Sequence, residues 1–92
     1  MYEFKNLFFD DINDDSLSDA EKTAIQTKKL IEIENINNNS VIVDLGANKG
    51  IVVENLLETG CTIHAYEPHP MYFDTLKSRF HDHSNVFLHN TE

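Results

Sequence analysis

The chain has 92 residues, of which 40% are hydrophobic and 25% are charged. This length suits one small globular domain and leaves no room for a second. Sixteen Asp and Glu against seven Lys and Arg give a formal net charge of −9, which repels phosphodiesters, so we expect no nucleic-acid partner. No run approaches the ~18 apolar residues of a membrane span. With its single cysteine, Cys61, the sequence predicts a cytoplasmic protein without a membrane partner.

Residues 1–39 predict an N-terminal arm followed by a helix. The aromatic start indicates a strand or extended arm, and an acidic loop follows through Asp10, Asp11, Asp14 and Asp15. Ser18 stands three residues before Glu21, which is the spacing of a capping box at a helix start. The asparagine-rich segment from Asn35 to Asn39 favours a turn and is the predicted end of the helix. The expected apolar stripe consists of Ala20, Ala24, Ile25, Leu30, Ile31 and Ile33.

Residues 40–92 alternate short apolar runs with helix-like segments. Strands are predicted at 41–45, 61–66 and 86–88, and helices at 49–59, stopped by Gly60, and 71–80. The run Val41-Ile42-Val43-Asp44-Leu45 is typical of a parallel strand covered on both faces. The sequence therefore predicts an α/β fold: an incomplete, Rossmann-like parallel sheet of about three strands with crossover helices, plus an N-terminal helix.

A glycine turn joins the first of these strands to the next helix. Its sequence is Asp44-Leu45-Gly46-Ala47-Asn48-Lys49-Gly50. Gly46 allows a sharp turn and lets a ligand approach without a Cβ in the way, and Gly50 allows the first helical turn to pack closely on the sheet. Free N–H groups at the helix start would attract a polar or anionic group.

An acid stands at the end of the second predicted strand. Glu67 follows Gly46 by 67 − 46 = 21 positions. An acid about 20 residues after a glycine turn often accepts hydrogen bonds from ribose hydroxyls, because neighbouring parallel strands end side by side. Asp44 replaces the first glycine of a dinucleotide fingerprint, and a carboxylate there suits a ligand with an ammonium group. We favour an amino-acid-bearing nucleoside over the alternative of plain turn glycines and a solvated acid.

The segment Val41 to Gly50, followed by Ala65-Tyr66-Glu67-Pro68-His69-Pro70, resembles the first two motifs of the S-adenosylmethionine-dependent methyltransferases, most closely the FkbM family. The resemblance covers about residues 40–89 and implies that residues 40–92 form the N-terminal half of a methyltransferase-type domain. It implies S-adenosylmethionine as cofactor and methylation of a hydroxyl oxygen on a small molecule, sugar or glycan. The cofactor-binding residues it implies are Asp44, Gly46, Ala47, Asn48, Gly50, Glu67, Pro68 and His69.

This chain departs from the family in its length. The family's domain has seven strands and binds its acceptor in a later region, so the catalytic residues stay unknown here. With the family's strand order 3-2-1-4-5, strand 41–45 would keep an open apolar edge. The chain is then a fragment, or another copy or a separate partner covers that edge, which makes a homo-oligomer one expectation.

Two rival functions follow from the same residues. The first is a non-catalytic, truncated or oligomerising module with a degenerate cofactor site. The second is a nicotinamide-dependent dehydrogenase, which shares the acid after the second strand but needs a pyrophosphate where Asp44 stands.

The histidines and the cysteine carry weaker signals. His81, His83 and His89 invite a metal hypothesis, but neither a cysteine nor a close acid completes the set, so we predict a polar loop and no metal site. His69 stands between two prolines, where an exposed, structural histidine is more common than a ligand. Cys61 lacks an evident His or Lys partner and is not expected to be a nucleophile.

Overall fold

The computed structural model describes residues 2–4 and 16–90. The acidic loop predicted between Asp10 and Asp15 lies outside the described residues. Among these residues, no helix has both the length and the apolar character needed to cross a membrane. In chain order the elements are β1 (Tyr2–Phe4), α1 (Asp19–Ile33), β2 (Val41–Leu45), α2 (Ile51–Leu56), η2 (Leu57–Thr59), β3 (Thr62–Tyr66), α3 (Pro70–Phe80) and β4 (Val86–His89).

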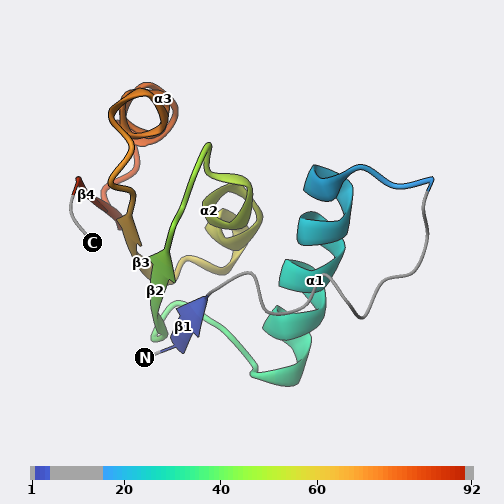
Figure 1. The fold of residues 1–92 in the computed structure, drawn as a ribbon. Coiled ribbons are helices and arrows are strands. Elements are labelled where there is room, and N and C mark those ends of the chain that lie inside the picture. Colours follow the sequence, from blue (N-terminus) through green and yellow to red (C-terminus); the bar gives the residue numbers. More distant parts are fainter. Residues whose placement is uncertain (1, 5–15, 91–92) are drawn as a thin grey trace.

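The strands form one parallel sheet in the order β1-β2-β3-β4 (Figure 1). This confirms the predicted α/β class, with an open, all-parallel sheet compatible with an incomplete Rossmann-like fold and an N-terminal helix. The register pairs Asp44 with Ala65 and Leu45 with Tyr66, so β2 and β3 end at the same edge of the sheet. The turn after β2 and the acid after β3 are therefore neighbours in space.

The expected open edge of strand 41–45 is wrong. β1 pairs with β2 in parallel, placing Tyr2 opposite Ile42 and Phe4 opposite Asp44. The N-terminal arm thus supplies a short strand that satisfies backbone groups which would otherwise face solvent. A homo-oligomer formed through a sheet edge stays a prediction, but the edge it would use is β1 or β4, not β2.

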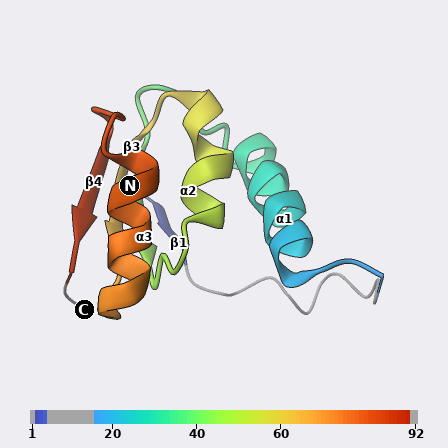
Figure 2. The same cartoon turned by 90° about the horizontal axis from the view of Figure 1, so that it is seen from above.

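All helices of the described part of the chain lie on one face of the sheet (Figures 1 and 2). Burial alternates accordingly along β2 and β3: Ile42, Asp44, Ile63 and Ala65 are buried beneath the helices, and their neighbours are half-buried. The expectation that strand 41–45 is covered on both faces is therefore wrong for these residues. We call the uncovered side the open face; its side chains on β2, β3 and β4 are Val41, Val43, Leu45, Thr62, His64, Tyr66, Phe87 and His89.

The N-terminal helix begins where the sequence predicts. Ser18 caps α1, its hydroxyl accepting from the Glu21 N–H at 3.1 Å while the Glu21 carboxylate accepts from the Ser18 N–H at 3.0 Å. The predicted apolar stripe is only partly correct. Leu30 is buried together with Thr27, but Ile25 and Ile33 are exposed, because the covered side of α1 is a narrow one facing α2.

The core lies between the sheet and the helices. Fully buried side chains come from α1, β2, α2, β3 with the residue before it, and α3: Thr27, Ile42, Val53, Leu56, Cys61, Ile63, Ala65 and Leu76. The predicted helix 49–59 divides into α2 and the 3-10 turn η2, and it ends at Gly60 with φ +72°, as expected. In α3, Leu76 and Phe80 face the core, whereas Met71 is exposed despite its place in the apolar pattern.

Gly50 packs against a different element from the one expected. A Cβ built on it would lie 2.4 Å from Cε2 of Phe80 and 3.0 Å from Cδ2 of Leu76. Both residues belong to α3, so the glycine allows α2 and α3 to approach one another rather than α2 and the sheet. Its φ of +94° also suits glycine.

Gly50→Ala should destabilise the fold more than Gly60→Ala. Both substitutions put a Cβ on a left-handed backbone, but the Cβ at Gly60 would lie 3.3 Å from Asn38 Cβ, without the clash met at Gly50. Overpacking typically costs about 1–3 kcal/mol, in addition to the strain that the two variants share. Urea unfolding of the two variants measures the difference. Equal losses of unfolding free energy would show that Phe80 moves aside without cost.

Candidate functional site

The turn after β2 crosses directly over the end of β3. The N–H groups of Gly46 and Ala47 both donate to the carbonyl oxygen of Tyr66, at 2.9 and 3.0 Å. Gly46 (φ +76°) and Asn48 (φ +57°) both adopt left-handed backbone, which lets the chain reverse within a few residues. The glycine turn is thereby anchored on the strand that precedes Glu67.

Glu67 ties the two strand ends together. One carboxylate oxygen accepts from the Asn48 N–H at 2.6 Å, and the other accepts from the His69 N–H at 3.0 Å. The side chain is 5% exposed. A buried carboxylate needs such charge-assisted bonds to offset its lost hydration. Glu67 is therefore a structural brace between the turn and the loop that leads to α3, as well as the predicted ribose ligand.

The prediction of free N–H groups at this turn is wrong at four positions. Gly46 and Ala47 donate to Tyr66, Asn48 donates to Glu67, and Gly50 donates to the Ala47 carbonyl at 3.0 Å. These four N–H groups donate to acceptors within the protein and are not free to bind an anion. The carboxylates of Asp44 and Glu67 and the open space at Gly46 remain as features that a ligand could contact.

Asp44 carries an unsatisfied oxygen. Its side chain is 3% exposed, and its Oδ2 atom has no hydrogen-bond partner among the described residues. Burial, reinforced by the nearby Glu67 carboxylate, raises the pKa of Asp44 from 3.8 to about 7. A buried polar atom without a partner is costly, and such atoms cluster at sites that bind something.

The space in front of the turn is open at Gly46. A Cβ built there would meet nothing within 4 Å, in contrast to Gly50 and Gly60. The structure thus brings together Asp44, Gly46, Asn48 and Glu67, which we call the strand-end site. All four were predicted from the sequence as binding residues. Ala47 and Gly50, also predicted, are buried behind the turn and support it.

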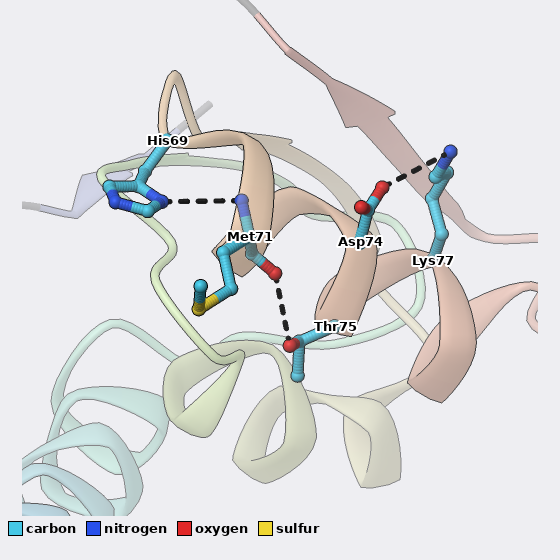
Figure 3. A network of polar contacts seen from close by, with 5 residues as sticks. All are labelled: His69, Met71, Asp74, Thr75 and Lys77. Carbon is cyan, nitrogen blue, oxygen red and sulfur yellow. Dashed lines mark hydrogen bonds and ion pairs between the residues drawn. The ribbon is translucent and has the colours of Figure 1, made fainter.

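His69 and Pro68 lie beside the strand-end site and are exposed. As Figure 3 shows, the His69 ring faces the start of α3, where its Nδ1 accepts from the Met71 N–H at 3.2 Å. The ring also stacks on Tyr72 with centroids 4.5 Å apart. His69 is thus the N-cap of α3, a structural role that the sequence favoured, and its exposed ring remains accessible to a ligand.

Three residues near the site were missed from the sequence. Tyr72 stacks on His69, and the Lys49 Nζ lies 5.9 Å from the Tyr72 ring centroid. The side-chain nitrogen of Asn90, just after β4, donates to the Glu67 carbonyl at 2.9 Å and to the Pro68 carbonyl at 3.2 Å. A polar residue two positions after the third predicted strand was a usable signal for Asn90, because that strand ends beside Glu67.

The three histidines of the rejected metal hypothesis lie apart from one another. His81 contacts Ser78 and Asp82, and His83 packs against Phe80, whereas His89 lies beside His64. Among residues 16–90, no group of three or more His, Cys, Asp or Glu side chains is placed to hold a metal ion. Burial raises the pKa of the fully buried Cys61 thiol, which disfavours the thiolate a nucleophile needs.

Comparison with known proteins adds no relative: no protein-family model matches the chain, and no curated protein matches it.

Asp44→Asn should change how stability depends on pH. Because the pKa is raised on folding, the folded state holds the Asp44 proton more tightly; the neutral form favours folding at low pH, and this advantage is lost as pH rises to about 7. A shift from 3.8 to about 7 corresponds to at most about 4 kcal/mol. Urea unfolding from about pH 4 to 8 should show this fall in the wild type and not in Asp44→Asn.

Asp74→Asn is the matched control, since the Asp74 side chain is 75% exposed and pairs only with Lys77 on the same helix. Asp74→Asn should lose unfolding free energy with rising pH as the wild type does. If Asp44→Asn loses it just as steeply, the Asp44 carboxyl group does not titrate in this range.

Proposed function

We propose that the strand-end site binds S-adenosylmethionine and that the chain is the cofactor-binding part of a FkbM-like methyltransferase. The observation that carries the proposal is the unsatisfied Oδ2 of Asp44, buried beside an open glycine turn. An unpaired carboxylate calls for a cationic partner, and the ammonium group of an amino-acid-bearing nucleoside supplies one. The methyltransferase family itself is proposed from the two motifs at 41–50 and 65–70.

Glu67 supports the nucleoside half of this ligand. A carboxylate offers about four lone-pair positions, of which Asn48 and His69 use one on each oxygen. Capacity for two further hydrogen bonds remains, which matches the two hydroxyls of a ribose. Its backbone bonds hold the carboxylate in one orientation before a ligand arrives, so less ordering is needed on binding.

The aromatic pair beside the turn supports an adenosine position. His69 and Tyr72 already stack with centroids 4.5 Å apart, and His69 is exposed. Flat rings at a site edge stack readily on a purine. Pro68 fixes the chain between Glu67 and His69, so the acid and the ring keep a constant separation.

Bound S-adenosylmethionine supplies a methyl group on a sulfonium, which an acceptor oxygen attacks in line. This chain's residues contribute by holding the cofactor: Asp44 at the ammonium, Gly46 by leaving room, and Glu67 at the ribose. Rate acceleration in such a transfer comes mainly from positioning and local electrostatics. The acceptor we propose is a hydroxyl group of a small molecule, sugar or glycan, by resemblance to the family.

Isothermal titration with S-adenosylhomocysteine tests cofactor binding. Gly46→Ala places a methyl group in the open space and should weaken binding by at least about tenfold, which is about 1.4 kcal/mol. Gly60→Ala shares the left-handed backbone, lies away from the strand-end site, and should bind as the wild type does. Well-folded wild type that binds no S-adenosylhomocysteine would end the proposal.

The alternative is an oligomerising module without turnover, which the uncovered apolar side chains of the open face favour. Sedimentation and a labelled-methyl assay separate the two. A stable oligomer that neither binds S-adenosylhomocysteine nor transfers methyl groups supports the module, and a monomer that binds it supports the methyltransferase.

A further inference from the structure

Two histidines meet on the open face, and neither side chain belongs to the strand-end site. His64 lies on β3 and His89 on β4, and their Nδ1 and Nε2 atoms are 3.1 Å apart. Both side chains are half-buried. The sequence did not indicate this pair, since the two residues are 89 − 64 = 25 positions apart and meet only through the strand register.

The two rings are held in place by aromatic neighbours. His89 stacks on Tyr66 with centroids 4.3 Å apart, and His64 stacks on Phe87 at 5.0 Å. The strand register fixes the backbone beneath them, pairing His64 with Phe87 and Tyr66 with His89. The strands therefore hold the two rings side by side before an ion arrives.

The facing nitrogens lie within hydrogen-bond distance of one another. An imidazole pair in hydrogen-bond contact has a donor on one ring and a lone pair on the other. Two nitrogens bound to a tetrahedral Zn²⁺ at about 2.0–2.1 Å lie about 3.3 Å apart. The observed 3.1 Å is a few tenths of an ångström short of this separation. Each ring must also turn to bind one ion, because the hydrogen-bonded nitrogens now point at one another.

We propose that His64 and His89 form a two-histidine site for a borderline divalent transition-metal ion, Zn²⁺ or Cu²⁺. Imidazole nitrogen suits these ions, whereas Ca²⁺ and Mg²⁺ require oxygen ligands. The open face leaves the remaining coordination positions to water, because no helix of the described residues covers it. The chain's net charge of −9 favours the approach of a cation to any accessible ligand pair.

Titration of the full chain with ZnCl₂, with CaCl₂ as the hard-cation control, tests the site. Wild type should take up Zn²⁺ saturably, and His64→Gln and His89→Gln should each weaken uptake by more than tenfold, since even an outer-shell partner is worth about 10–100-fold. The matched controls are His81→Gln and His83→Gln, which should keep wild-type affinity because these residues lie outside the pair. Circular dichroism confirms that each variant is folded.

Nitrogen-15 spectra of the histidine rings give a second readout that needs no variant. Zn²⁺ should shift His64 Nδ1 and His89 Nε2 and leave the His81 and His83 rings unchanged. The proposal is overturned if Zn²⁺ is not bound, if uptake survives in both His64→Gln and His89→Gln, or if Ca²⁺ binds with equal affinity. S-adenosylhomocysteine binding should be unaltered in both pair variants, so the metal site and the proposed function fail independently.

Discussion

The strand-end site depends on two buried carboxylates, Asp44 near the end of β2 and Glu67 directly after β3. The Glu67 carboxylate accepts hydrogen bonds from the N–H groups of Asn48 and His69, and so fixes the glycine turn and the loop before α3. Asp44 has no such partner for Oδ2, and burial raises its pKa to about 7. The protein thus offsets one buried charge with hydrogen bonds and the other by partial protonation, since two unpaired charges in one small core would cost several kcal/mol.

Local sequence signals predicted most of the fold. Three features depend only on residues close together in the sequence, and each lies where it was expected. They are the capping box at Ser18, the helix end at Gly60 and the strand at 41–45. The strand-end site was also predictable, because parallel strands end side by side and the spacing from Gly46 to Glu67 fits one crossover. What failed depended on tertiary detail: the turn N–H groups are already used, and Gly50 packs on α3.

The one-sided layering explains the remaining errors. On the side of β2 that no described helix covers, the side chains are the apolar Val41, Val43 and Leu45. The sequence pattern alone therefore predicts a strand that is buried on both faces. Side chains alternate along β3, so Ala65 points to the helices and His64 and Tyr66 point to the open face. The histidine pair therefore lies on the face opposite the helices. A ligand beside Gly46 and an ion at the histidine pair consequently share a strand without sharing side chains.

The arm strand β1 constrains any extension of the sheet. A strand has two edges, and β2 pairs with β3 along one and with β1 along the other, from Ile42 to Asp44. The strand order implied by the methyltransferase resemblance puts a later strand at the place that β1 occupies. Three residues of parallel pairing involve few hydrogen bonds, each worth about 1 kcal/mol net, so a longer strand would displace β1 at small cost. Without such a strand, β1 covers the edge of β2 from Ile42 to the buried Asp44.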